Sequence, residues 1–288
     1  MMRKKPMLAH PVGGFERIKD DDWPLYSQPK LDGVRCVIQA EMDGTVIAYS
    51  RTGKEWKNID HILKELKPFF YKFPNIILDG ELYNHELKND FEKIISLVRK
   101  TKPMYHDRVE SEMKVQFHCY DTIMEHMDFK DRHKFIREHF SIKDREFPYP
   151  SVRPLIAATV SNTEEVEVYH EEFLEAGYEG SILRKNKPYE CKRSWTLMKV
   201  KDFSDAEATI TGWVEGKGKR KGTIGKFTAV DSDGNEFGMP VMDKFEYLQE
   251  NFEEMKTWVG QLATFKYFER TKANSYRHPL FKTIRDYE

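Results

Sequence analysis

The sequence has little of several features that would assign it to a specific class of protein. Its three cysteines, Cys36, Cys119 and Cys191, lie far apart and lack the spacing of metal ligands. Such cysteines are expected to be reduced thiols of an intracellular protein. No internal repeat or low-complexity tract is present, which argues against a solenoid or a disordered tail.

Long apolar runs are also missing. Residues 1–5 are basic, but residues 6–12 are too short and too mixed to form the apolar region of a secretory signal. No run approaches the roughly 18 apolar residues of a membrane span. We therefore expect a soluble cytoplasmic protein with no membrane partner.

Neither sign of charge is in excess, although 33% of the residues are charged. Lys plus Arg number 47 and Asp plus Glu number 48, which leaves a formal charge of -1. Any surface that attracts nucleic acid must therefore be a local patch. With 288 residues, of which 39% are hydrophobic, the chain can form one or two domains.

Strand and helix patterns alternate up to residue 201. Residues 33–40 and 45–50 flank an Asp-Gly turn signal and predict a β-hairpin. The spacing of one helical face predicts helices at residues 59–66 and 91–98. Four further strands are predicted to present polar side chains at an end or on one face: residues 75–78, 115–121, 178–184 and 196–201. This layout predicts a cleft lined by sheets.

The pattern changes near Asp202. Five short strands are predicted after it, at residues 208–214, 223–230, 235–239, 262–268 and 281–284. One helical segment, residues 244–259, interrupts them. Five strands and one helix in about 85 residues are typical of a small oligonucleotide-binding (OB) barrel.

Six short motifs carry the candidate chemistry. They are KLDGVR at 30–35, SRTG at 50–53, DGEL at 79–82, FHCYD at 117–121, EGSILR at 179–184 and LMKVK at 197–201. Taken alone, a Lys-x-Asp-Gly is more often a solvated turn, an acid more often a surface residue, and a phenylalanine more often part of a core. All six in this order are far more specific than any one of them.

The set resembles the nucleotidyltransferase motifs of ATP-dependent DNA ligases and their relatives, from about Pro6 to the C-terminus. The resemblance implies an enzyme that seals 5'-phosphate/3'-hydroxyl nicks in duplex DNA during replication, repair and recombination. It also implies an α+β fold. An ATP-grasp-like nucleotidyltransferase (adenylation) domain of antiparallel sheets and helices, residues 1–201, would be followed by an OB-fold β-barrel, residues 202–288. Because few residues precede Lys30, we expect a minimal enzyme of the kind found in viruses and bacteria. The resemblance also implies an enzyme that can act as a monomer.

The expected catalytic residues are Lys30, Lys199 and Lys201. By resemblance, Lys30 carries the AMP, and Lys199 and Lys201 bind the α-phosphate. A nucleophilic lysine must be partly neutral, and neighbouring cations favour the neutral amine because they disfavour protonation. Lys199 and Lys201 could supply these neighbouring positive charges and also bind phosphate.

The remaining nucleotide contacts follow from the resemblance. Arg35 and Glu81 would contact the ribose, Phe117 would stack on adenine, and Gln28 would contact the adenine amino group. Phosphoryl transfer depends on charge neutralisation, so Mg²⁺ or Mn²⁺ is expected on carboxylate and phosphate oxygens. Glu179 is the predicted metal-linked acid, with Glu81 as a second candidate.

DNA contacts are expected at two places. By resemblance, Ser50 and Arg51 contact the 5'-phosphate of the nick, where a guanidinium suits phosphate geometry. Residues 216–222 place four cations among three glycines: Lys217, Lys219, Arg220 and Lys221. This segment is either a solvated hairpin loop or a grip on the phosphate backbone.

The C-terminal motif departs from the family pattern. Arg285 would help to expel pyrophosphate, but the chain ends RDYE where relatives usually have Arg-x-Asp-Lys. Arg277 or Lys282 could share this role.

Three alternatives stay open: an RNA ligase, an mRNA-capping guanylyltransferase that uses GTP, and a non-catalytic nucleic-acid-binding protein. The Tyr-Asp at residues 120–121 and the Asp-Ala-Glu at residues 205–207 look more like DNA ligases. A decayed site would lack one of its lysines, yet Lys30, Lys199 and Lys201 are all present.

Overall fold

The computed structural model describes residues 3–11, 18–88, 90–140, 149–200, 204–267, 269–270, 274–277 and 279–285. The chain forms two compact units, Met1–Lys201 and Asp202–Glu288. In the described ranges, no helix is long and apolar enough to cross a membrane.

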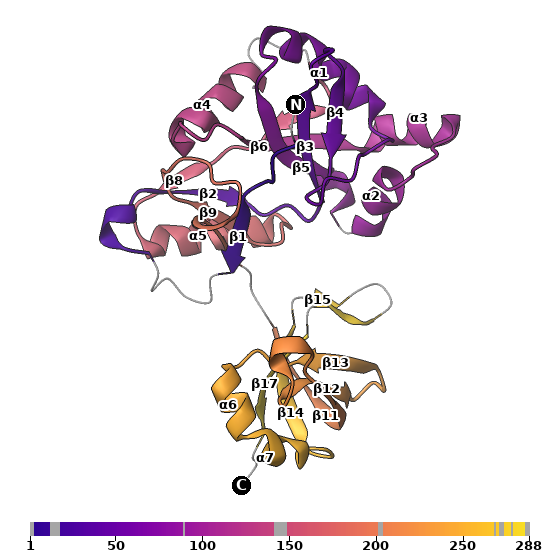
Figure 1. Ribbon diagram of the computed structural model, residues 1–288, viewed down its shortest axis with the longest axis vertical. Coiled ribbons are helices and arrows are strands. Elements are labelled where there is room, and N and C mark those ends of the chain that lie inside the picture. The colour runs from indigo at the N-terminus through magenta and orange to yellow at the C-terminus, as the bar shows by residue number, and fades with distance from the viewer. Residues whose placement is uncertain are drawn as a thin grey trace. The chain divides into compact units, whose positions relative to one another are not determined.

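Two five-stranded sheets form the centre of the first unit (Figure 1). The first has the order β1-β10-β9-β2-β8, with strands Leu8–Pro11 (β1), Leu25–Pro29 (β2), Ala158–Val160 (β8), Ser181–Arg184 (β9) and Arg193–Val200 (β10). The second has the order β4-β3-β5-β6-β7, with strands Val34–Ala40 (β3), Val46–Tyr49 (β4), Ile77–Tyr83 (β5), Gln116–Thr122 (β6) and Val152–Pro154 (β7). β1 runs parallel to β10 and β6 to β7, whereas the other pairs are antiparallel.

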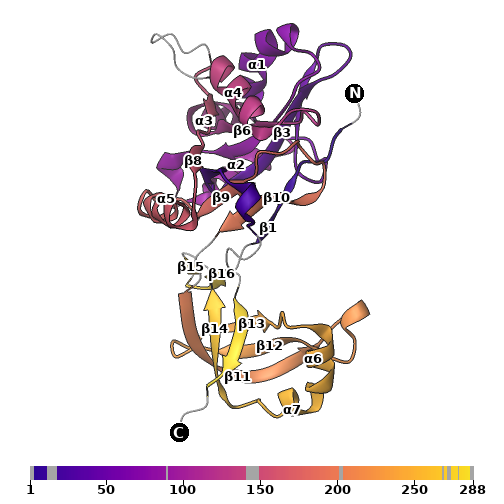
Figure 2. The ribbon, with the colours of Figure 1, turned by 90° about the vertical axis from the view of Figure 1, so that its left-hand side faces the viewer.

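Helices cover the outer faces of these sheets (Figure 2). They are Asp60–Lys72 (α1), Phe91–Val98 (α2), Tyr105–Lys114 (α3), Phe129–Phe140 (α4) and Thr163–Glu175 (α5), with 3₁₀ turns at Asp20–Asp22 (η1) and His85–Leu87 (η2). Leu66 of α1 and Leu78 of β5 belong to the core on the helical side of the second sheet. Val37 of β3 and Leu197 of β10 belong to the cluster that joins the two sheets. Full burial of such a side chain contributes about 1.5–3 kcal/mol, so the sheets are held firmly against each other.

The predicted elements of this unit are confirmed. The hairpin is β3 and β4, which pair from Val37 to Ala40 and turn at Gly44, whose φ of 82° favours glycine. The two predicted helices are α1 and α2, and the four polar-ended strands are β5, β6, β9 and β10. The α+β class with mainly antiparallel sheets follows from these elements.

The second unit is one antiparallel sheet with the order β13-β12-β11-β14-β17. Its elements are Ser204–Glu215 (β11), Gly218–Arg220 (η3), Ile224–Val230 (β12), Glu236–Pro240 (β13), Phe245–Glu250 (α6), Phe252–Lys256 (α7), Leu262–Tyr267 (β14) and Leu280–Ile284 (β17), together with a hairpin of Glu269–Arg270 (β15) and Tyr276–Arg277 (β16). Among the described residues no ladder joins β13 to β17, so the closed OB barrel stays a prediction.

One element of this unit differs from expectation. The single helix predicted at residues 244–259 is two short helices that meet at Asn251. The side-chain amide of Asn251 donates a hydrogen bond to the carbonyl oxygen of Tyr247 at 2.7 Å. Because asparagine side chains compete for backbone groups in this way, the residue ends α6 although the apolar spacing continues.

Candidate active site

A pocket of about 250 Å³ lies in the first unit and is lined by strands of both sheets. The predicted cleft is therefore present. Six of the residues selected from the sequence line it: Gln28, Lys30, Arg35, Arg51, Glu81 and Lys199. Lys201 lies outside the described residues. Tyr120, Arg184 and Arg193 also line the pocket, and the sequence patterns did not assign them a role there.

Backbone pairing between two distant segments positions Lys30. The Lys30 N–H donates to the carbonyl oxygen of Gly180 at 2.8 Å, and the Glu179 N–H donates to the carbonyl oxygen of Lys30 at 3.0 Å. The Lys30 ammonium forms an ion pair with the Glu179 carboxylate, and the two side chains are 18% and 4% exposed. Gly180 has a φ of 139°, which favours glycine at this bend. The fold thus brings the predicted nucleophile to the predicted metal-linked acid.

Positive charge accumulates on one side of the pocket, at Lys199. Burial lowers the pKa of Lys199. The positive charges of Lys30, Arg193 and Arg51 lower it further. The like charges of these side chains repel one another. A bound anion would offset that repulsion, so this side of the pocket suits an anion.

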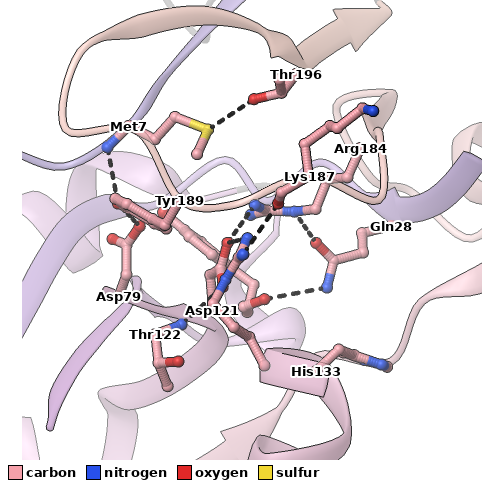
Figure 3. Close-up of polar contacts among 12 residues, drawn as sticks. Met7, Gln28, Asp79, Asp121, Thr122, His133, Arg184, Lys187, Tyr189 and Thr196 are labelled. Atoms are coloured by element: carbon pink, nitrogen blue, oxygen red, sulfur yellow. Dashed lines mark hydrogen bonds and ion pairs between the residues drawn. The ribbon is translucent and has the colours of Figure 1, made fainter. Parts of the chain in front are cut away.

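Arg35 is fixed by a buried carboxylate. Its Nε and Nη2 donate to the two Asp79 carboxylate oxygens at 2.7 and 2.5 Å, and Nη2 also donates to the Met7 carbonyl oxygen at 3.1 Å. The Tyr189 hydroxyl donates to Asp79 at 2.6 Å and accepts from the Met7 N–H at 2.7 Å (Figure 3). The N-terminal segment is thereby tied to the wall of the pocket.

Glu81 lies opposite Arg35 in the β3–β5 ladder. Burial raises the pKa of Glu81 to about 7, although the charges of Arg35 and Lys30 lower it. The Tyr120 hydroxyl donates to the Glu81 carboxylate at 3.2 Å. This acid therefore titrates near neutral pH inside the pocket.

Among the described residues that line the pocket, the aromatic one is Tyr120, and the predicted adenine contact of Phe117 needs correction. Phe117 is 0% exposed, belongs to the core on the helical side of its sheet and does not line the pocket. Residues three apart on a strand point to opposite faces, so one motif cannot present both rings to one site. The Arg35 and Arg184 guanidinium carbons lie 5.2 and 5.5 Å from the centroid of the Tyr120 ring. Strand alternation within residues 116–122 was the signal that could have identified Tyr120.

A buried network holds Gln28, which is 1% exposed. Its Oε1 accepts from Arg184 Nε at 2.7 Å, and its Nε2 donates to the Leu155 carbonyl oxygen at 3.1 Å. Arg184 Nη1 donates to Asp121 at 2.6 Å (Figure 3), and Asp121 also accepts from Arg132 Nε at 2.7 Å. Gln28 Nε2 also donates to the carbonyl oxygen of Tyr120 at 3.5 Å, so protein partners engage both N–H groups and one lone pair remains on Oε1 for any contact with a base.

The two residues predicted to contact the nick phosphate lie in the turn after β4. The Ser50 hydroxyl accepts from the Lys54 N–H at 3.0 Å and thus holds the turn. Arg51 is exposed and lines both the pocket and a neighbouring groove. Of the pair, Arg51 has the side chain presented toward the site.

The basic loop of the second unit contains two kinds of cation. Lys217, Lys219 and Lys221 are exposed. Arg220 instead donates to the carbonyl oxygens of Val241 and Asp243, each at 2.8 Å. Its guanidinium anchors the loop to the segment after β13, so the three lysines are the better candidates for external contacts.

The C-terminal cations have acidic partners within the second unit. Arg285 pairs with Glu207, and Lys282 pairs with Asp205. The side chain of Arg277 lies outside the described residues. The predicted role of Arg285 toward ATP stays a prediction.

Carboxylates alone would not hold a metal ion here. In the part of the chain that the structure describes, no group of three or more His, Cys, Asp or Glu side chains could do so. Glu179 pairs with Lys30, and Glu81 accepts from Tyr120. A divalent ion at this site would take most of its ligands from phosphate and water, which is how Mg²⁺ is usually bound.

Comparisons with known proteins agree with this geometry. The profile of the family described as "ATP dependent DNA ligase domain" matches residues 6–201. The DNA ligase of African swine fever virus is 31% identical over 204 residues, which cover 68% of this chain and 46% of that protein. The chain spans about half the length of such curated relatives.

Solved structures give the same picture. A structure from a study of Lig E DNA ligases, concerned with DNA binding by a minimal scaffold, is 25% identical with a TM-score of 0.74, and the match covers 99% of this chain and 100% of that one. The Chlorella virus DNA ligase-adenylate is 24% identical with a TM-score of 0.55, covers 99% of each chain and supports the fold alone. The matched profile spans all six motifs and all the strands that line the pocket. The chain therefore belongs to the ATP-dependent DNA ligase domain family.

Proposed function

We propose that this chain is an ATP-dependent DNA ligase that seals nicks in duplex DNA and acts as a monomer. The observation that carries the proposal is the pocket that joins Lys30 to Lys199, Glu81 and Tyr120. It combines an amine nucleophile, a cationic wall for phosphates and an aromatic face for a base, which adenylyl transfer requires. Residues 1–201 would be the adenylation domain and residues 202–288 an OB-type domain that binds DNA.

The reaction would proceed in three displacements at phosphorus. First, neutral Lys30 Nζ attacks the α-phosphorus of ATP, the bond to pyrophosphate breaks, and the proton of the amine leaves. Second, a 5'-phosphate oxygen of the nick attacks the same phosphorus, the P–N bond breaks, and Lys30 takes up a proton. Third, the 3'-hydroxyl attacks the 5'-phosphorus, loses its proton and releases AMP.

Each lining residue has a role that suits its position. Lys199 would neutralise the α-phosphate, with Lys201 as a second cation. Glu81 and Arg35 would hold the ribose, and Tyr120 would stack on adenine in place of Phe117. Gln28, oriented by Arg184, could offer its remaining lone pair to the adenine amino group.

A divalent cation fits this donor set. Glu179 supplies one carboxylate beside the α-phosphate position, and Mg²⁺ commonly binds one or two carboxylates together with substrate phosphates. When bound, Mg²⁺ or Mn²⁺ would neutralise phosphate charge. Arg51 would contact the 5'-phosphate of the nick, and Lys217, Lys219 and Lys221 would contact the DNA backbone.

The test is to incubate the protein with ATP or GTP labelled at the α-phosphate, and separately with nicked DNA or RNA. We expect an acid-stable, hydroxylamine-resistant protein adduct from ATP and sealing of nicked DNA. An adduct from GTP alone would identify a guanylyltransferase. Sealing of RNA but not DNA would identify an RNA ligase, and the absence of any adduct would leave a binding protein.

A further inference from the structure

A second concave surface adjoins the pocket in the first unit and is called the side groove here. It has a volume of about 540 Å³ and shares Arg35, Arg51 and Glu81 with the pocket. Its other walls come from the turn after β4 and from the C-terminal end of α2. Whatever occupies the side groove therefore lies next to the pocket that contains Lys30.

Three cations line the side groove: Arg51, Lys54 and Arg99. All three are exposed, and among the described residues no ion pair joins any of them to an acidic side chain. Other exposed cations nearby are paired, such as Arg108 with Asp60. In a chain with a formal charge of -1, a row of unpaired cations leading away from the pocket forms a local positive patch.

The floor of the side groove is apolar. Trp56 is 6% exposed and is fixed through its Nε1, which donates to the Arg35 carbonyl oxygen at 3.2 Å. Val34 and Ile95 lie beside it and are partly buried. An apolar floor between cationic walls suits a nucleic-acid backbone, because the sugar can pack on the floor while its phosphates meet the cations.

Both cationic walls are held in place by backbone contacts. In the turn, the Ser50 N–H donates to the Lys54 carbonyl oxygen at 2.7 Å, and Gly53 has a φ of 84° that favours glycine. Arg3 Nη1 donates to the Gly53 carbonyl oxygen at 2.6 Å and thus ties the turn to the N-terminal segment. Arg99 follows α2, and its N–H donates to the Ile95 carbonyl oxygen at 3.0 Å. The backbone that carries these three cations is therefore pre-organised for binding.

We infer that Arg99 and Lys54 bind backbone phosphates of the nicked strand beside the phosphate contacted by Arg51, and so position the nick for sealing. This inference rests on the proposed function. Arg99 is a positioning residue that no motif contains, and α2 thereby becomes part of the DNA-binding surface. The triphosphate of ATP is the other anion that could reach the groove, so the test separates the two ligands.

The experiment compares Arg99→Gln and Lys54→Gln with Arg137→Gln, which removes an exposed charge from α4 away from both cavities. We expect each groove variant to weaken nick binding and to flatten the plot of log affinity against log salt by up to about 0.9 per lost contact. The yield of lysyl-AMP and the KM for ATP in adduct formation should match those of the wild type. Arg137→Gln should change none of these quantities.

Neutral methylphosphonates placed one at a time around the nick then locate the contact. For Arg99→Gln, one methylphosphonate should cause no further loss of affinity, although it weakens the wild type. The inference would be overturned if Arg99→Gln had the same salt slope as Arg137→Gln. It would also be overturned if every methylphosphonate weakened nick binding by Arg99→Gln and by the wild type to the same extent. A raised KM for ATP would assign the groove to the triphosphate instead. All these outcomes differ from the absence of any adduct in the wild type, which would overturn the proposed function itself.

Discussion

The ammonium group of Lys30 and the carboxylate of Glu179 form an ion pair although 149 positions separate them in the sequence. An ammonium ion has no lone pair with which to attack phosphorus. The pair must therefore separate, and Lys30 must lose a proton, before an adduct can form. Phosphate and Mg²⁺ could separate it by offering each partner an opposite charge.

Substitution of Lys30 tests the nucleophile. Lys30→Ala should form no adduct with ATP, because no other amine would be placed at the α-phosphate. Sealing of a pre-adenylated nick, which bypasses the first step, should survive at least in part. Lys185→Ala is the matched control, since Lys185 follows β9 but pairs with Asp22 and does not line the pocket. Full activity of Lys30→Ala with ATP would contradict the assignment.

Substitution of Glu179 tests the carboxylate. Glu179→Gln keeps the size of the side chain but removes the charge that would bind a divalent ion. We expect adduct formation and the sealing of pre-adenylated nicks to slow by about a hundredfold to a thousandfold, the range found for loss of one electrostatic group. Both rates should be measured across a magnesium titration. Rates equal to those of the wild type at every magnesium concentration would remove Glu179 from the mechanism.

The raised pKa of Glu81 predicts a pH dependence of ATP binding. With a pKa of about 7, the carboxyl is mostly ionised above neutral pH and mostly protonated below it. If the carboxylate accepts hydrogen bonds from the ribose, the KM for ATP in adduct formation should rise by up to about tenfold as the pH falls one unit below the pKa. Glu81→Gln should lack this rise. ATP titrates equally in both assays, so a rise of the same size in the variant would show that Glu81 is not responsible.

The two aromatic residues of the β6 motif should separate binding from stability. Tyr120→Ala should raise the KM for ATP between about fivefold and a hundredfold through lost stacking, whereas Tyr120→Phe should retain most of the affinity. Phe117→Ala should lower the free energy of unfolding by about 3–5 kcal/mol, because it leaves a cavity in the core. Denaturant melts and adduct kinetics measure the two effects. A larger KM effect for a folded Phe117→Ala than for Tyr120→Ala would restore the original assignment.

The basic loop predicts a salt effect carried by its lysines. Replacing Lys217, Lys219 and Lys221 with Ser should flatten the salt dependence of nick affinity by up to about 0.9 per lost phosphate contact on a logarithmic scale. Arg220 is left intact, because its guanidinium anchors the loop to backbone carbonyls. Adduct yield should not change, since the pocket belongs to the first unit.

The control for the loop removes the same charge elsewhere. Lys57, Lys64 and Lys67 are exposed on the first unit and lie outside the active-site pocket. Their replacement by Ser should leave the salt slope unchanged. If the two triple variants have equal slopes, the loop is a solvated hairpin that does not contact DNA.

Local patterns were sufficient where a residue's own neighbours determine its conformation. Alternation and an Asp-Gly turn predicted β3 and β4, and helical spacing predicted α1 and α2, because these periods follow from backbone geometry. The motifs and the family resemblance likewise selected six of the residues that line the pocket, five of them within the motifs. The same kind of pattern failed at residues 244–259, where the side chain of Asn251 ends a helix that apolar spacing would continue.

The chemical groups and their order can be read from the sequence alone: the lysine of the Lys-x-Asp-Gly motif, the acids Glu81 and Glu179, and the lysines at positions 199 and 201. Which of these groups meet depends on the tertiary fold. It placed Tyr120 in the pocket and Phe117 in the core, used Arg220 as an anchor, and joined Arg99 of α2 to the groove beside Arg51. The reason is that the face on which a side chain lies, and the residues that it contacts, depend on strands and helices from distant parts of the chain. The neighbouring residues in the sequence do not specify those contacts.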